Sequence, residues 1–458
     1  MQCRKANLLV GLSFFLTPVL VAAAQTTPEE TVLEMLERDQ PYHTVSEELF
    51  KNLGWELPDG GLQVKKLADE APGSAIDPRM IETLDSDNLG YTAKWHELRF
   101  SKYNLDWDIP GLHLVPNNPL PDMPTLVIIH GGNWNWHYWF LDPLNNAGVG
   151  QYLAQKIPVL LITIPGRYRH GGWIEQDYVN RTPGYLLDGD VSAEETKIRN
   201  AIYTFQLVAD GVEELVNTVI SGPIVIVGHS TGGELQFILK NSSLAERMHG
   251  LSLGWATGGP ARLQSMVEFR GPRTVDDYID IWDLRERPAS GLAGGYLGPL
   301  NPIWNPEDSR KEMSERWFGL EQRRIPGFKH VLQDMEHQGA ANLIIHVTTQ
   351  VRQALEGNTL GVSPEAVISD LFSTMRSPLN GYRRMIWTVA AQDDGHWTPE
   401  DPLSSREFLV AEEFRKENPD IPIRVMVYDL PLTHQGGIET PRELAGGFLA
   451  ALKWLVLP

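Results

Sequence analysis

The most informative segment of the chain reads Pro223-Ile224-Val225-Ile226-Val227-Gly228-His229-Ser230-Thr231-Gly232-Gly233-Glu234. It begins as a run of β-branched apolar residues, which is typical of a strand buried on both faces. It then turns through Gly-x-Ser-x-Gly, and Glu234–Lys240 continues with a helical composition. We therefore predict a strand, a tight turn and a helix, with the hydroxyl of Ser230 exposed on the turn. Gly228 and Gly232 suit this turn because a side chain at either position would collide with a neighbouring strand or helix.

A serine on such a turn acts in acyl transfer only if backbone N–H groups bind the oxyanion that forms. Thr231, which follows the serine, would supply one of these donors. A second buried strand begins at Thr125 and ends in the glycines of His130-Gly131-Gly132-Asn133. Glycine lets the backbone approach a substrate closely, so this loop would supply the other donor from Gly132 or Asn133.

Two later apolar runs are each followed by residues that can transfer or orient a proton. Met385–Ala390 precedes Asp393 and Asp394, and Pro422–Tyr428 precedes His434 and a Gly-Gly pair. A histidine would take the serine proton as general base, and a carboxylate would orient the imidazole. His396 competes with His434 for the first role, and Asp429 competes with the two earlier aspartates for the second. His229 is expected to pack.

Ser230 is followed by an acid after the next-to-last strand and by His434 after the last one. This order resembles the α/β-hydrolase superfamily from about Trp95 to Pro458, minus the lid. The resemblance implies an α/β fold with a mostly parallel central sheet, helices on both faces and an inserted helical lid. The alternation of strand and helix patterns indicates the same class. Members often carry Gly-x-x-Asp after the next-to-last strand, and Ala391-Gln392-Asp393-Asp394 is similar with Ala in place of Gly. We therefore assign Asp394 as the acid, with Asp393 as the alternative.

The chain divides into five expected parts. Alternating patterns at Trp95–Asn104 and Gly111–Val115 predict early antiparallel strands, and the spacing of apolar residues predicts helices at Glu29–Arg38 and within Ser192–Ile220. The expected parts are a signal peptide (1–24), an N-terminal extension that wraps the main domain (25–94), the first part of the hydrolase core (95–257), an inserted lid or cap (258–382) and the second part of the core (383–458).

The first 24 residues read as a secretory signal peptide. Met1–Lys5 is basic, Ala6–Val21 is apolar, and Ala22–Ala24 provides small residues before a cleavage point near Gln25. A membrane anchor is the alternative, but the apolar stretch is short and contains a proline. The only cysteine, Cys3, would be removed with this segment, so the mature chain would have no disulfide. We predict an exported protein that is periplasmic or secreted.

Charge and residue spacing limit the expected partners. The formal net charge is −20, and it becomes about −22 once the basic leader is removed. Such a surface repels nucleic acid and anionic lipid, which favours a small-molecule substrate and no membrane insertion after cleavage. We identify no spacing of metal ligands that would explain these residues better than the catalytic triad of Ser230, His434 and Asp394, and we expect no cofactor. The oligomeric state stays open.

The residues after the oxyanion loop bear on substrate choice. Trp134 and Trp136 begin an aromatic run that would either line a pocket or pack in the core, and Arg167 would hold a carboxylate or pair with a surface acid. We predict a serine hydrolase that cleaves small or medium esters, apolar or aromatic, through an acyl-enzyme. The alternatives are a peptidase, lactonase or thioesterase of this fold, a lyase or cofactor-free oxygenase, and a non-catalytic binding protein.

Overall fold

The computed structural model describes ten continuous parts of the 458-residue chain and some single residues between them. The continuous parts are 26–58, 89–130, 147–163, 205–229, 242–253, 351–376, 383–391, 399–405, 418–430 and 440–456. We call residues 26–58 the N-terminal segment.

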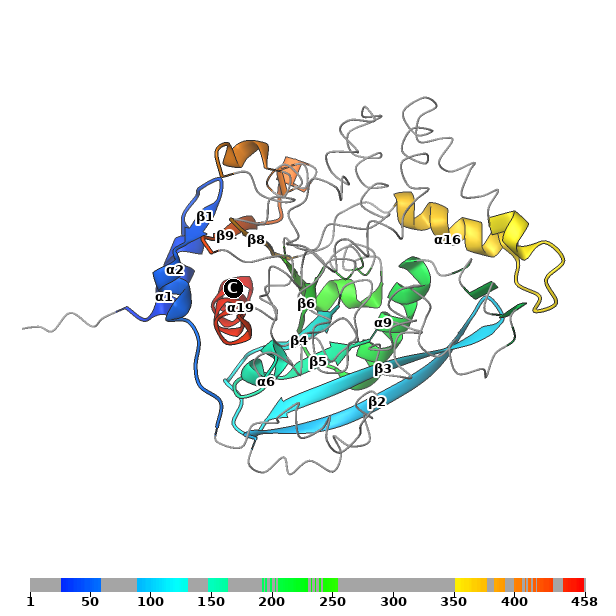
Figure 1. The fold of residues 1–458 in the computed structure, drawn as a ribbon, viewed down its shortest axis with the longest axis horizontal. Coiled ribbons are helices and arrows are strands. Elements are labelled where there is room, and N and C mark those ends of the chain that lie inside the picture. Colours follow the sequence, from blue (N-terminus) through cyan, green and yellow to red (C-terminus); the bar gives the residue numbers. More distant parts are fainter. Residues whose placement is uncertain are drawn as a thin grey trace, which may run out of the picture.

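The described strands form a mixed sheet of nine strands in the order β1-β9-β8-β7-β6-β4-β5-β3-β2 (Figure 1). Neighbours from β1 to β5 in that order are parallel, whereas β3 is antiparallel to β5, and β2 is antiparallel to β3. The predicted α/β fold with a mostly parallel sheet is confirmed. The strands are β1 (His43–Val45), β2 (Tyr91–Lys102), β3 (Leu105–Pro116), β4 (Thr125–Ile129), β5 (Val159–Ile162), β6 (Ile224–Gly228), β7 (Met248–Leu253), β8 (Met385–Ala390) and β9 (Ile423–Tyr428).

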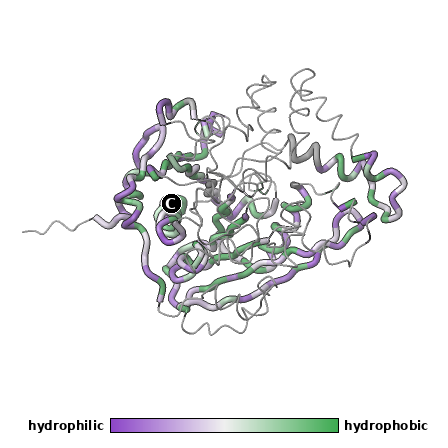
Figure 2. Tube along the Cα trace, in the orientation of Figure 1, coloured by the Kyte–Doolittle hydropathy of each residue, from purple (hydrophilic) through white to green (hydrophobic). Residues whose placement is uncertain are grey.

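The central strands are apolar on both faces because both faces are covered. In β4, Leu126 and Ile128 join one core cluster, whereas Val127 and Ile129 join the other. Successive side chains of a strand point to opposite faces, so a continuous apolar run supplies two cores at once. In Figure 2 the central strands of the sheet are mostly coloured hydrophobic, and hydrophilic colour gathers toward the outside.

Helices cover each face of this sheet (Figure 1). One cluster takes its residues from α1 (Pro28–Glu37), α2 (Glu47–Lys51), α6 (Val149–Leu153) and α19 (Pro441–Leu455). The other takes them from α9 (Phe205–Val219) and α16 (Pro364–Arg376). Two short 3₁₀ helices, η3 (Ser243–Arg247) and η6 (Pro402–Ser404), complete the described elements. Along the described residues, no helix combines the length and apolarity needed to cross a bilayer.

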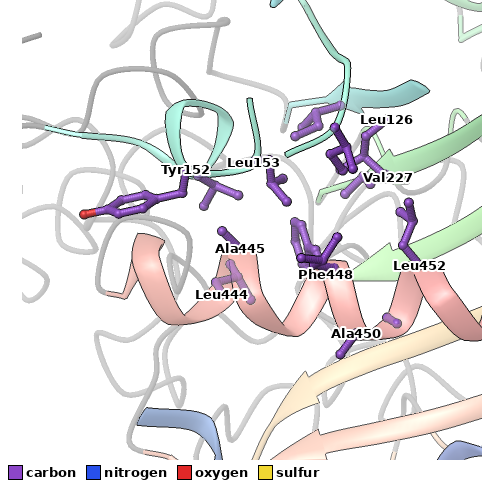
Figure 3. Packing of buried hydrophobic residues seen from close by; sticks show 14 of the residues in the cluster. Leu126, Tyr152, Leu153, Val227, Leu444, Ala445, Phe448, Ala450 and Leu452 are labelled. Atoms are coloured by element: carbon purple, nitrogen blue, oxygen red, sulfur yellow. The ribbon is translucent and has the colours of Figure 1, made fainter. Parts of the chain in front are cut away.

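The last helix lies at the centre of the first cluster. Phe448 of α19 is fully buried and lies on the side of the helix that faces Leu153 of α6 and Val227 of β6 (Figure 3). Gly446 allows this helix to approach the N-terminal segment, because a Cβ there would lie 2.2 Å from the carbonyl oxygen of Leu53. The C-terminal helix therefore packs directly against the backbone of the N-terminal segment.

The predicted antiparallel strands are present and are longer than expected. β2 and β3 each have 12 residues, and β2 begins at Tyr91. They are joined by Tyr103 and Asn104, which both have positive φ angles of 55° and 60°. Two such residues form the turn whose twist matches that of the flanking strands. The strand ladder therefore continues to the tip of the hairpin.

The N-terminal segment contains one predicted element, α1, and two that were not predicted, β1 and α2. α1 matches the expected helix and begins with a capping box in which Thr27 and Glu30 exchange hydrogen bonds. β1 extends the sheet by pairing in parallel with β9, so His43 lies beside Met426 and Val45 beside Tyr428. This part of the N-terminal segment is thus an edge strand of the sheet.

Candidate functional site

The site is built at the carboxyl ends of β4 and β6, which are adjacent and finish level with each other. Ile129 of β4 pairs with Gly228 of β6, and the N–H of His229 donates a 3.0 Å hydrogen bond to the carbonyl oxygen of Ile129. His130 and His229 follow these strands and are 0% and 1% exposed. The expectation that His229 packs is therefore met.

The chain turns sharply after β6. The N–H of Gly232 donates a 2.8 Å hydrogen bond back to the carbonyl oxygen of His229, and helical conformation follows at Gly232, Leu235 and Leu239. The two leucines are fully buried and lie one turn apart, so the helix has its apolar face on the core. The strand, turn and helix predicted around Gly-x-Ser-x-Gly are present in the described residues.

Gly232 also brings this turn against the end of β4. A Cβ at Gly232 would lie 2.2 Å from the carbonyl oxygen of Ile129 and 2.8 Å from that of His130. Both atoms belong to the backbone and cannot rotate away, so only glycine fits. Sequence reasoning found the need for glycine, but it did not identify Ile129 and His130 as the groups that Gly232 meets.

A second junction lies where β8 and β9 end. The carbonyl oxygen of Tyr428, the last residue of β9, accepts hydrogen bonds from the N–H of Ala391 at 2.8 Å and from the N–H of Leu430 at 2.9 Å. Asp429, which the sequence left open as an acid, is exposed, and its N–H donates to the carbonyl oxygen of Val45 in β1. Sequence reasoning did not single out Tyr428, because its only signal is its place at the end of the strand.

The predicted site residues themselves lie outside the described residues. They are the catalytic Ser230, His434, Asp394 and Asp393, the oxyanion residues Gly132, Asn133 and Thr231, and the pocket residues Trp134, Trp136 and Arg167. The described structure gives the strand ends that precede them. The four strands β4, β6, β8 and β9 are parallel, so their carboxyl ends lie at the same edge of the sheet. The segments that contain the predicted site residues begin there, after Ile129, His229, Ala391 and Leu430.

Two cavities among the described residues adjoin β1 or the start of β9. One of about 490 Å³ is lined by Met35 to Thr44, and one of about 730 Å³ is lined by parts of 39–41 and 403–424. The larger cavity includes Ile423 and Arg424 at the beginning of β9, whereas the smaller one includes His43 and Thr44 of β1. Within the described ranges, no group of three or more His, Cys, Asp or Glu side chains is placed to hold a metal ion.

The model of the family described as "Alpha/beta hydrolase family" matches residues 126–445. This range includes β4 from its second residue, every strand from β5 to β9 and the beginning of α19. No curated protein matches the sequence.

The solved structures to which this chain is similar have very different sequences. A thermophilic esterase from Thermogutta terrifontis is 14% identical, covers 80% of this chain and 100% of its own, and has a TM-score of 0.34. A membrane phospholipase A, a bacterial virulence factor, is 15% identical, covers 82% of this chain and 90% of its own, and has a TM-score of 0.37. A bromoperoxidase from Bacillus anthracis is 9% identical, covers 78% of this chain and 100% of its own, and has a TM-score of 0.36. At these TM-scores the family assignment rests on the family model.

Proposed function

Because this chain belongs to the alpha/beta hydrolase family, we propose that it is a serine hydrolase that cleaves carboxylic esters. In this proposal Ser230 is the nucleophile, His434 is the general base, and Asp394 orients the histidine, with Asp393 as the alternative acid. The residue types and their order after β6, β8 and β9 suit these roles.

The observation that carries the proposal is the contact of Gly232 with the end of β4. Gly232 follows Ser230 by two residues, and Ile129 and His130 immediately precede Gly131 and Gly132. Because a Cβ at Gly232 would lie only 2.2 Å from the Ile129 oxygen, the turn and the glycine loop start from the same place. Acyl transfer needs a nucleophile and oxyanion donors within about 3 Å of one carbonyl group, and this contact supports such an arrangement.

The reaction follows from the proposed parts. The Oγ of Ser230 attacks the ester carbonyl while the imidazole of His434 accepts its proton. The backbone N–H groups of Thr231 and of Gly132 or Asn133 stabilise the negative oxygen. The C–O bond to the alcohol then breaks, and the imidazolium returns the proton to the leaving oxygen. Water, activated by the same imidazole, attacks the acyl-enzyme and releases the carboxylic acid.

The proposed substrate is a small or medium ester with an apolar or aromatic acyl group. Trp134 and Trp136 follow the proposed oxyanion loop directly in the sequence, which would place aromatic surface beside the reacting carbonyl. Arg167 follows β5, the neighbour of β4, and would hold a substrate carboxylate. Peptide, lactone and thioester substrates use the same acyl-enzyme and are the alternatives to compare.

The test is the intact mass of the protein after treatment with a fluorophosphonate. We expect one adduct on the Ser230 peptide, with none on Ser230→Ala and none on His434→Ala. Ser101→Ala, which changes an exposed serine on β2, is the matched control and should label like the wild type. A folded wild type that reacts with neither this probe nor a smaller one would contradict the acyl-enzyme mechanism and favour a binding protein.

A panel of substrates then separates the alternatives. We expect higher kcat/KM for aromatic or apolar acyl esters than for peptides, lactones and thioesters of similar size. Trp134→Ala should reduce this preference if the aromatic run lines the pocket. Equal rates with Trp134→Ala and wild type would instead place the tryptophan in packing.

A further inference from the structure

Tyr428 lies at the point from which two of the proposed catalytic segments leave the sheet. Its carbonyl oxygen accepts hydrogen bonds from Ala391 and Leu430. Asp393 and Asp394 follow Ala391 by two and three residues, and His434 follows Leu430 by four. The carbonyl group of Tyr428 therefore links the end of β8, which precedes the proposed acid, to the end of β9, which precedes the proposed base.

The side chain of Tyr428 is held from two sides. Its ring is fully buried, and its centroid lies 4.9 Å from that of Phe50 with a tilt of 59°. Its hydroxyl faces α19 at Gly447, where a Cβ would lie 2.6 Å from the oxygen. The tyrosine is thus enclosed between α2 and α19, and any change in Phe50 alters the space available to its ring.

The N-terminal segment also holds the backbone around Tyr428. Val45 pairs with Tyr428, and the carbonyl oxygen of Val45 accepts a 2.9 Å hydrogen bond from Asp429. Phe50 is 1% exposed on α2, a helix whose first turn is capped by Ser46. The pairing of β1 with β9 therefore continues through Asp429, one residue past the end of β9 and toward the segment that contains His434.

The N-terminal segment also contacts α19, the helix that follows His434 in the sequence. The carbonyl oxygen of Leu53 contacts Gly446, as described above, and Arg442 donates a 2.8 Å hydrogen bond to Glu56. Lys453 forms an ion pair of 2.7 Å with Glu29. Residues on both sides of 431–439 are consequently bound to the N-terminal segment.

We propose that Phe50 and Tyr428 are positioning residues for catalysis, through which the N-terminal segment sets the relative placement of the acid and the base. This inference rests on the proposed roles of Asp394 or Asp393 and of His434. A displacement of about 1 Å of a catalytic group can reduce a rate about 100-fold. Phe50 acts at a distance from the substrate, by fixing the strand end that both groups share.

The test compares Phe50→Ala and Phe50→Leu with wild type. We expect kcat for an ester to fall about 10-fold or more in Phe50→Ala, KM to stay within about twofold, and Phe50→Leu to recover most of the loss. The acidic limb of the kcat/KM profile should move to lower pH, because a carboxylate that orients the imidazole less well stabilises its charged form less. If Phe50→Ala does not fold, Phe50→Leu carries the test, because it should show a smaller loss of kcat and a smaller shift of the acidic limb in the same direction, and a Phe50→Leu protein identical to wild type in both would overturn the proposal.

Leu36→Ala is the matched control. Leu36 is fully buried in the same core cluster, but it lies on α1. It should lower the thermal midpoint about as much as Phe50→Ala and leave kcat and the pH profile unchanged. Equal losses of kcat in both variants, or an unchanged kcat in Phe50→Ala, would overturn the proposal.

Hydrogen exchange separates this inference from the proposed function. In Phe50→Ala, amides of 386–391 and 424–430 should exchange faster than in Leu36→Ala, whatever the activity. An inactive, unlabelled wild type with this exchange pattern would refute the proposed function and leave the coupling of the strand ends supported. An active wild type without this pattern would refute the coupling alone.

Discussion

The hydroxyl of Tyr103 donates a 2.5 Å hydrogen bond to the carboxylate of Asp370. This bond joins the tip of the β2–β3 hairpin to α16, which lies at the end of the predicted insertion. Asn104 adds a 2.7 Å hydrogen bond to the carbonyl oxygen of Gly361. The described end of that insertion, 351–376, is therefore attached to the core through the hairpin and α9.

Lys102 should be the main electrostatic contributor to this attachment. It is 19% exposed and contacts Asp210 of α9 as well as Asp370, at 2.7 Å from the latter. Lys102→Met would leave two half-buried carboxylates without their cation and should lower the free energy of unfolding by about 1–3 kcal/mol. Urea denaturation measures this loss. Lys94→Met, exposed on the same strand, should change it by less than about 0.5 kcal/mol; similar losses in both variants would refute this role.

Gly232→Ala should destabilise the protein and impair its labelling. The added methyl group would meet the carbonyl oxygens of Ile129 and His130, and such overpacking costs about 1–3 kcal/mol. Chemical denaturation and the rate of fluorophosphonate labelling would measure the two effects. Gly222→Ala is the control because nothing lies within 4 Å of the new atom. A Gly232→Ala protein as stable and reactive as Gly222→Ala would contradict the tight approach.

Acid should destabilise the protein through three histidines, of which His43 is buried and His113 and His249 are partly buried. Burial lowers the pKa of His43, His113 and His249 from 6.5 to about 4, with further contributions from nearby cations. The folded state then binds fewer protons than the unfolded state, so this stability is complete above pH 6.5 and is lost as the pH falls toward 4.

His43→Gln tests one of these contributions. Besides burial, Arg424, Arg38 and Arg415 disfavour the charged form of His43. The variant cannot titrate, so its free energy of unfolding should fall less steeply between pH 6.5 and about 4 than that of the wild type. Denaturation curves across this range would show it. Parallel curves for the two proteins would mean that His43 does not contribute.

We also propose that the chain is exported, because the first 24 residues have the pattern of a cleaved leader. Expression with the natural leader should yield a mature protein that begins near Gln25 in the periplasmic or secreted fraction. N-terminal sequencing and intact mass would identify the end. A chain that keeps its leader and stays with the membranes would support an anchor instead.

Strands with both faces buried could be predicted closely from the sequence. Met385–Ala390 matches β8 residue for residue, and the strand expected from Thr125 up to the glycines after His130 contains β4, because each is a continuous apolar run. β1 could not be found in this way. It has three residues, the middle one is exposed, and it forms a strand only through its pairing with β9 at the other end of the chain.

The chemistry of the candidate site could be predicted from residue types and order, whereas its supports could not. The motif around Ser230 is local, and the described turn at Gly232 agrees with it. The contacts of Gly232 with Ile129 and of Tyr428 with Phe50 join segments far apart in the sequence, which periodicity does not reveal. Asp393 and Asp394 are adjacent in the sequence, and residue type alone does not distinguish them, so that choice stays a prediction.

The pairing of β1 with β9 imposes an order on folding. His43 to Val45 are among the first residues of the fold to be synthesised, and their partners Met426 to Tyr428 are among the last. Until β9 has been synthesised, β1 lacks the described strand with which it pairs. Closing a loop of nearly the whole chain is slow and entropically costly. This edge of the sheet can therefore form only after β9 has been synthesised, and a chain that lacks β9 would expose Phe50 and Val45 to solvent and to chaperones.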